Sequence, residues 1–249
     1  MLMLKIFSTL SIFLLIHFLG AARDPMRLTH GPMLGNPTSD SVRVWGRTSD
    51  PGEFSVRYGI AEDKLDQTSD PATTLISNDN TGYATLRDLE PDQTYHYQIF
   101  IKHRPHGLPG SFLTLPNAES TRNAEHNPRG LFNFRFQIGS CANQNPIHGN
   151  GHRAKTYENL NRDWAHKTNF HIMNGDWLYE ELREYPVEAW RLRAGIDTLP
   201  SSVNLMPTVV GVWENYKLYL SRGISLTQWH RHVPSFFTFD DHELVNDIW

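Results

Sequence analysis

Hydrophobic and polar positions alternate in short runs along the first half of the chain. Val42 and Val44 alternate with polar neighbours, and clusters of Pro, Gly, Asn and Asp separate this run from those that follow. Short alternating runs divided by turn residues are typical of an all-β sandwich. Trp45 is large enough to fill the space between two small sheets, and we expect it there. The pattern therefore predicts a β-sandwich over residues 27–115.

The stretch LRDLEPDQTYHYQIFIK adds a more specific feature to this prediction. Leu89, Pro91 and Tyr95 are spaced as in a tyrosine corner, in which the phenol hydroxyl bonds to backbone upstream of its strand. Tyr95, Tyr97 and Ile99 then share one face of a strand. The arrangement resembles a fibronectin type III sandwich, although any small β-sandwich could carry it.

A polar segment ends the sandwich, and the hydrophobic pattern changes beyond it. Residues 116–130 contain almost no hydrophobic side chain and are rich in Pro, Asn, Ser and Gly, which predicts a linker. The run 131–138 alternates as a strand would, with four residues on one face: Phe132, Phe134, Phe136 and Ile138.

Strands and helices alternate in the second half. Short apolar runs predict strands at 169–173 and 235–239, and a helix is also expected at 185–195. Helical spacing connects two sets of residues: Tyr157, Leu160 and Trp164, and Trp213, Tyr216 and Leu220. The order strand, helix, strand, helices, strand predicts a parallel sheet with right-handed crossovers.

The first 22 residues have the pattern of a signal peptide. One positive charge at Lys5 precedes an apolar run over residues 6–19, and Gly20 and Ala22 supply a small-residue cleavage site. The run is short for a membrane span, although an uncleaved anchor is the alternative. We expect a secreted, periplasmic or cell-envelope protein with no stable membrane span after cleavage.

Charge and cysteine content narrow the possible partners. The formal net charge of −4 provides no basic stripe, so we expect no specific nucleic-acid recognition. The chain has one cysteine, Cys141, which cannot form an internal disulfide. It could be an inert buried thiol, form an intermolecular disulfide, or serve as a metal ligand or nucleophile. The sequence does not specify an oligomeric state.

Each strand of the second half runs into a polar cluster. The clusters are 139–143 with Cys141, 174–180 with Asp176 and Tyr179, and the Asp-Asp-His-Glu run 240–243. Parallel strands would bring them to the same edge of the sheet, where ligands bind in open α/β folds. A metal cation is the simplest way to stabilise so many anionic groups. His230 and His232, in contrast, are expected on the surface.

Three motifs in this order carry a family resemblance. GSCAN, NGDWLYE and VPSFFTFDDHELVND, preceded by a small β-sandwich, resemble the alkaline phosphatase D family of secreted metallophosphoesterases. The resemblance implies Fe3+ and Ca2+ as cofactors, with Cys141, Asp176 and Tyr179 in the iron site and Asp176 as a bridge. Asp241 becomes a further ligand candidate, and His242 a catalytic acid or phosphate-oxygen donor. Asp240 and Glu243 are expected to support the site.

The resemblance also implies an activity. The substrate would be a small-molecule or polymeric phosphomonoester or phosphodiester, hydrolysed through a metal-activated hydroxide. Residues 131–249 are shorter than that architecture requires, so we expect an incomplete α/β metallophosphoesterase domain with exposed apolar faces and impaired activity. The alternative is a secreted β-sandwich binding module with a vestigial, non-catalytic α/β part.

Overall fold

The computed structural model describes residues 25–145, 149–179 and 209–243. The predicted signal peptide and the helix expected at 185–195 lie outside these ranges. Within them, no helix is both long enough and apolar enough to cross a membrane.

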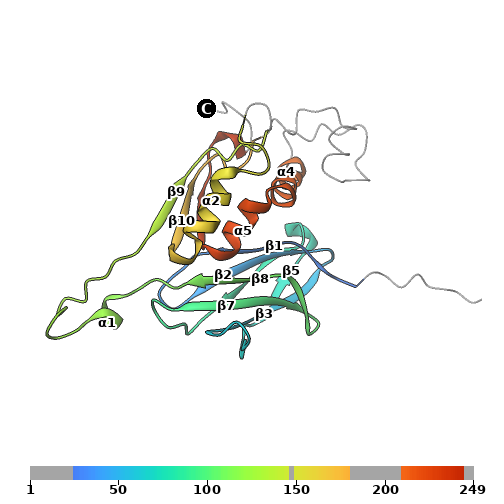
Figure 1. Cartoon of the computed structure of the whole chain (residues 1–249). Helices are drawn as coiled ribbons and strands as arrows, with labels where there is room; N and C mark the ends of the chain where they lie inside the picture. The colour runs from blue at the N-terminus through green and yellow to red at the C-terminus, as the bar shows by residue number, and fades with distance from the viewer. Residues whose placement is uncertain (1–24, 146–148, 180–208, 244–249) are drawn as a thin grey trace, which may run out of the picture.

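The first part of the chain folds into two facing sheets (Figure 1). Strands β6, β2 and β1 pair antiparallel in one sheet, and β4, β3, β7 and β8 form the other, with β5 paired to β3. The bounds are β1 Leu28–Gly35, β2 Val42–Thr48, β3 Gly52–Gly59, β4 Gln67–Thr68, β5 Ala72–Thr74, β6 Thr81–Leu86, β7 Thr94–Ile101 and β8 Arg104–Leu113, with a short 3-10 helix η1 at Ile76–Asn78. This sandwich confirms the β-rich architecture expected from the alternating pattern.

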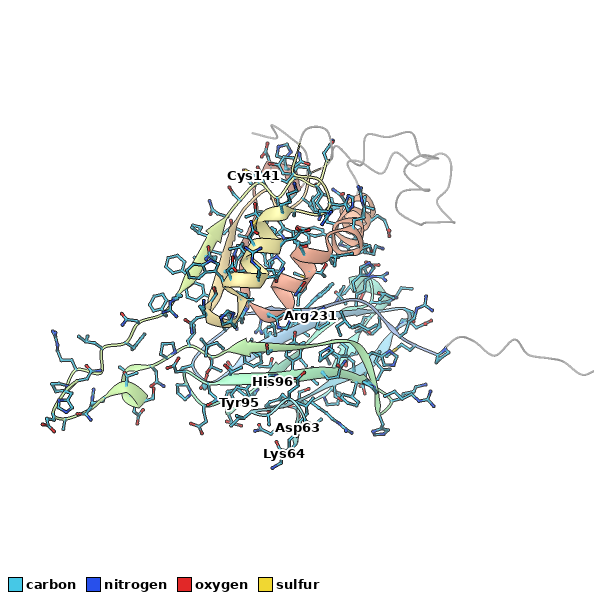
Figure 2. The ribbon with its side chains drawn as sticks, viewed as in Figure 1. Asp63, Lys64, Tyr95, His96, Cys141 and Arg231 are labelled. Atoms are coloured by element: carbon cyan, nitrogen blue, oxygen red, sulfur yellow. The ribbon has the colours of Figure 1, made fainter. Side chains whose placement is uncertain are left out.

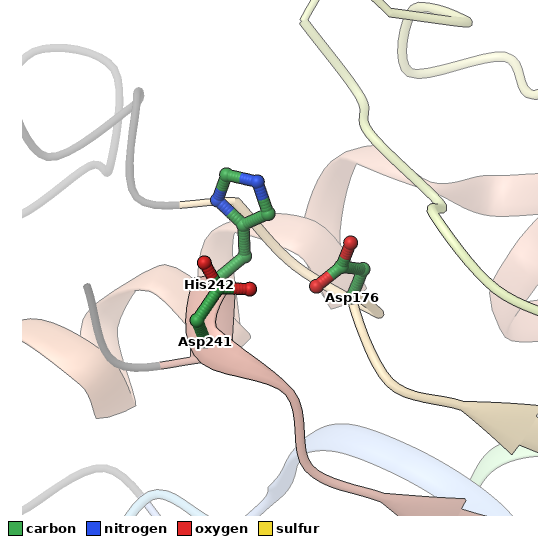
Figure 3. A group of neighbouring side chains, drawn as sticks. All are labelled: Asp176, Asp241 and His242. Atoms are coloured by element: carbon green, nitrogen blue, oxygen red, sulfur yellow. The ribbon is translucent and has the colours of Figure 1, made fainter. Parts of the chain in front are cut away.

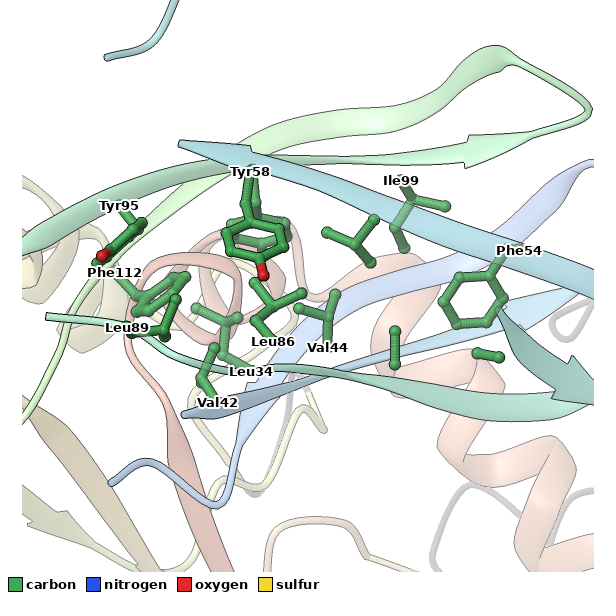
Figure 4. Close-up of a cluster of buried hydrophobic side chains, with 14 of the residues drawn as sticks. Leu34, Val42, Val44, Phe54, Tyr58, Leu86, Leu89, Tyr95, Ile99 and Phe112 are labelled. Atoms are coloured by element: carbon green, nitrogen blue, oxygen red, sulfur yellow. The ribbon is translucent and has the colours of Figure 1, made fainter. Parts of the chain in front are cut away.

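The core of the sandwich lies between the two sheets (Figure 4). Val42 and Val44 point into it from β2, and Tyr95 and Ile99 point into it from β7. The prediction for Trp45 is wrong. Successive side chains of a strand point to opposite faces, so Trp45 lies on the outside of the sandwich and packs against the core of the second half.

The tyrosine corner is confirmed. The backbone N–H of Glu90 donates a hydrogen bond of 2.9 Å to the Tyr95 hydroxyl. This bond joins the turn before β7 to a ring that is 2% exposed. A buried phenol oxygen requires such a partner, so the hydroxyl holds the turn in place.

The expected strand at 131–138 is wrong over its first five residues. The segment 116–130 contains a short helix, α1 (Ala118–Thr121), and strand β9 covers only Phe136–Gly139. Its partner β10 (Phe170–Asn174) starts opposite Phe136, and Asn169 adds one last pair of hydrogen bonds to Arg135. No described strand therefore lies beside the residues before Arg135 to continue the ladder.

Three parallel strands form the second half, as predicted. Strand β10 pairs in parallel with β9 on one side and with β11 (Ser235–Thr238) on the other. Helices lie over one face of this sheet (Figure 1). They are α2 Lys155–Asp163, α4 Val209–Arg222 and α5 Ile224–His232, with short 3-10 turns η2 at Ala165–Lys167 and η4 at Asp241–Glu243.

The opposite face of this sheet carries exposed phenylalanine rings. Phe136 stacks on Phe170 at 5.3 Å between centroids, and Phe170 meets Phe236 edge-on at 5.8 Å. Phe136 and Phe236 are 48% and 40% exposed. The four residues predicted to share a face are all exposed: Phe132, Phe134, Phe136 and Ile138. This phenylalanine face matches the expectation of an exposed apolar surface.

The two halves are joined through a common sheet. Strand β1 of the sandwich pairs in parallel with β11, at Gly35 and Ser235, so one sheet runs from β6 to β9. Helix α5 packs against β1 and β8, and the Tyr97 hydroxyl donates to the carbonyl oxygen of Arg231 at 2.9 Å. Arg231 lies where the halves meet (Figure 2).

Candidate metal centre

The loops after β9 and β10 are held in unusual backbone conformations. Cys141 has φ of 60° and Asp176 has φ of 54°, both in the left-handed region that residues other than glycine rarely occupy. The backbone N–H of Ala142 donates to the Asp176 carbonyl at 2.8 Å, so the loops also bond to each other. Strained residues of this kind cluster at functional sites.

The structure brings the five residues selected from the sequence together. Asp176 Oδ2 accepts hydrogen bonds from the Cys141 thiol at 3.5 Å and from the Tyr179 hydroxyl at 3.1 Å. One ligand atom from each of Asp176, Asp241 and His242 lies within 4.8 Å of the others (Figure 3). The rings of Tyr179 and His242 are 4.0 Å apart, centroid to centroid.

The electrostatics of this cluster favour a bound cation. Burial, the hydrogen bond with Cys141 and the negative charge of Asp176 raise the pKa of the Tyr179 phenol. The second carboxylate oxygen, Asp176 Oδ1, is buried and has no hydrogen-bond partner among the described residues. A buried anionic oxygen without a partner is costly, and a cation would satisfy it. The residues present therefore fit a metal ion.

Glu243 holds the Asp176 loop from behind. Its side chain is 1% exposed, and its carboxylate accepts backbone N–H groups of Asp176 at 3.1 Å, Trp177 at 2.6 Å and Asp240 at 2.8 Å. These bonds satisfy both a buried charge and backbone donors that would otherwise be left without partners. The supporting role expected from the sequence agrees with this geometry.

Tyr219 of α4 is a structural residue that sequence reasoning missed. Its hydroxyl oxygen accepts from the backbone N–H of Gln144 at 3.3 Å and from that of Tyr179 at 3.0 Å. One hydroxyl therefore connects the cysteine loop to the loop of Asp176. A signal was available, because Tyr219 lies three residues after Tyr216 on an apolar helix face, where a phenol needs a polar partner.

The expectation that His230 lies on the surface is wrong. His230 is 0% exposed, and its Nε2 accepts from the Trp177 indole N–H at 3.3 Å. Its Nδ1 lies 2.7 Å from Ser235 Oγ, which itself donates to the Val233 carbonyl, so the network places a proton on Nδ1. Burial and His171 lower the pKa of His230. His232 is half-buried and contacts Ser111.

The fold and the site together define a class of protein. It combines a β-sandwich with a parallel α/β sheet whose carboxyl edge carries a candidate metal centre. A family model described as the N-terminal domain of PhoD-like phosphatases matches residues 17–116, and one described as PhoD-like phosphatase matches residues 136–249. The chain belongs to the PhoD-like phosphatase family.

Solved structures add a likeness of fold. The structure of PhoD superposes with a TM-score of 0.63 at 20% sequence identity, and the match covers 86% of this chain and 39% of that chain. The chain thus spans less than half the length of that protein. The sensor domain of the anti-sigma factor RsgI4 in Pseudobacteroides cellulosolvens covers 39% of this chain and all of its own, at 19% identity and a TM-score of 0.31. No curated protein is similar enough to be matched.

Proposed function

We propose that this protein is an exported, metal-dependent phosphoesterase acting on phosphomonoesters or phosphodiesters. The observation that carries the proposal is the buried Asp176 Oδ1, which has no hydrogen-bond partner within the described ranges and lies in a cluster with a thiol and a phenol. Family membership supports the reaction class, and the pattern of residues 1–22 supports export. The tyrosine corner supports a fibronectin type III-like kind of sandwich.

The donor types support a mixed pair of metals. We assign Cys141, Asp176 and Tyr179 to an Fe3+ ion, because thiolate and phenolate donors stabilise a trivalent charge. Asp241 supplies carboxylate oxygen, the ligand type that Ca2+ requires. When bound, the metals would supply Lewis acidity that activates water and neutralises the phosphate oxygens.

His242 is the proton donor in this proposal. Its imidazole lies against the Tyr179 ring and within reach of Asp176 and Asp241, so it borders the region in which a phosphate group would sit. From there it can hydrogen-bond a phosphate oxygen or protonate the departing alkoxide. The Tyr219 and Glu243 hydrogen bonds keep the two loops fixed while this occurs.

Metal analysis and hydrolysis assays on matched variants test the proposal. We expect Asp176→Asn and Cys141→Ser to lose bound iron and to reduce hydrolysis of bis(p-nitrophenyl) phosphate by about a hundredfold or more. Tyr179→Phe should also remove a visible tyrosinate-to-iron absorption band. The control is Asp163→Asn, which changes an exposed carboxylate paired with Arg162. Iron-free protein with full activity, or Asp176→Asn with unchanged metal and hydrolysis, would contradict the proposal and favour a binding module.

A further inference from the structure

A cavity of about 510 Å3 lies between strands β6, β2 and β1 of the common sheet and helix α4 of the second half. Its walls come from the outer face of β1, β2 and β6, from helix α4, and from β11 and the segment after it. Sites for small molecules typically enclose roughly 300–1,000 Å3. The five candidate metal-site residues do not line it, but Trp177 and Glu243, which adjoin or hold the Asp176 loop, do, so the cavity borders the candidate metal centre.

Aromatic side chains face each other across this cavity. Trp45 of β2 and Tyr83 of β6 are cross-strand partners on one wall, and Trp213 and Tyr216 of α4 stand on the other. Tyr216 also stacks on Trp177, with ring centroids 5.5 Å apart and an interplanar angle of 22°. Opposed aromatic walls favour a flat or apolar occupant, because each face of such a group can then pack against a ring.

In the part of the chain that the structure describes, one cationic side chain of the cavity has no carboxylate partner. Asp79 pairs with Arg47 at 2.9 Å and with Lys217 at 3.4 Å. The Glu243 carboxylate already accepts hydrogen bonds from backbone N–H groups of the loop that contains Asp176. Arg43 makes no ion pair among the described residues, and its guanidinium lies 4.5 Å from the centroid of the Tyr83 ring. Among the described residues that line it, the cavity therefore has one positive charge without a carboxylate partner, next to an aromatic wall.

We propose that this cavity is a binding site for an amphiphilic anion, a flat or compact apolar body that carries one negative group. The apolar part of the ligand packs between Trp45 and Tyr83 on one side and Trp213 on the other. Its negative group pairs with Arg43. Arg43 is exposed, so the anionic end of the ligand reaches solvent while its apolar end is enclosed.

Calorimetric titration of the full chain with naphthalene-2-sulfonate tests the proposal. Arg43→Gln should weaken binding of this anion by about tenfold and leave binding of the uncharged 2-naphthol unchanged. The matched control is Arg57→Gln. Arg57 also lies over an aromatic ring, with its guanidinium 4.3 Å from the Phe100 centroid, but it belongs to the other sheet and does not line the cavity.

A second variant tests the aromatic walls. Trp213→Ala should weaken both probes, because both use the apolar part of the cavity. Equal binding by Arg43→Gln and the parent chain, or equal weakening by Arg57→Gln, would overturn the proposal. So would loss of binding in Phe236→Ser, since that result would place the probe on the exposed phenylalanine face.

Discussion

A buried histidine, His171, makes the stability of the fold depend on pH. The His171 side chain is 2% exposed and is surrounded by rings, with centroid distances of 5.9 Å to Trp229 and 5.8 Å to His230. Neither of its ring nitrogens has a hydrogen-bond partner among the described residues. Burial alone lowers the pKa of His171 to about 4. The folded state therefore holds this imidazole neutral.

The size of the effect follows from the two pKa values. The unfolded chain protonates His171 below pH 6.5, whereas the folded chain resists protonation until the pH reaches about 4. Between these values the unfolded state binds more protons, so the free energy of unfolding falls as the pH falls. From pH 7 to pH 5 the loss from His171 is about 2 kcal/mol.

His171→Phe removes both the titration and the unpaired nitrogens. The larger ring can extend into the adjoining cavity of about 190 Å3, which His171 lines together with Tyr157 and Leu160. At pH 7.5 we expect the variant to be at least as stable as the parent, because leaving a buried polar group unsatisfied costs about 1–3 kcal/mol. At pH 5 the advantage should grow by about 2 kcal/mol.

Urea unfolding followed by tryptophan fluorescence, repeated from pH 5 to pH 8, measures both quantities. The control is His126→Asn, which changes an exposed histidine side chain in the segment between the sandwich and β9. The reasoning is refuted if the parent and His171→Phe lose stability in parallel over this range.

Three further substitutions test the hydrogen bonds that hold the structure. Glu243→Gln replaces one of the two carboxylate oxygens by an NH2 group that cannot accept, so the backbone N–H group of either Asp176 or Trp177 loses its partner, and iron affinity should fall about tenfold in a metal titration. Tyr219→Phe leaves two backbone N–H groups unsatisfied and should cost about 1–3 kcal/mol for each in urea unfolding. Tyr95→Phe breaks the tyrosine corner and should cost about 1 kcal/mol.

The matched control for the two tyrosines is Tyr83→Phe. Tyr83 is 52% exposed, so its hydroxyl can bond to water and its loss should leave the urea midpoint unchanged. If Tyr219→Phe behaves like Tyr83→Phe, the hydroxyl does not hold the two loops together. Unchanged iron affinity in Glu243→Gln would likewise contradict the orienting role of that carboxylate.

The sequence predicted the features that depend on local periodicity. Polar clusters after three strands were expected at one edge of a parallel sheet, and Cys141, Asp176 and Asp241 do meet there. The tyrosine corner was predictable for the same reason, because the hydrogen bond spans five residues. Side chains of β2 alternate between the two faces of the sheet, as expected for a strand. This alternation, applied strictly, would have placed Trp45 on the opposite face from Val44.

Features that depend on distant partners were not predictable in this way. Strand β9 is short because β10 begins opposite Phe136, a fact that the alternating sequence before it does not contain. His230 is buried because Trp177, more than fifty residues earlier, supplies a donor to its ring. The role of Tyr219 likewise depends on two loops that only the folded chain brings together. The sequence identifies each of these residues, but the strand or side chain that it contacts is brought close only by tertiary packing.

The shared sheet has a consequence for how the protein is made. Strand β1 leaves the ribosome before β11, and until β11 is synthesised no described strand lies along that edge of β1. The sandwich can close around its own core before that point, because β1 to β8 precede the linker. We expect its free edge to act as a template on which β11 aligns, which brings Asp241 to the candidate metal centre. Assembly of the site is therefore expected to wait for a contact between the two ends of the described chain, which places it late in folding.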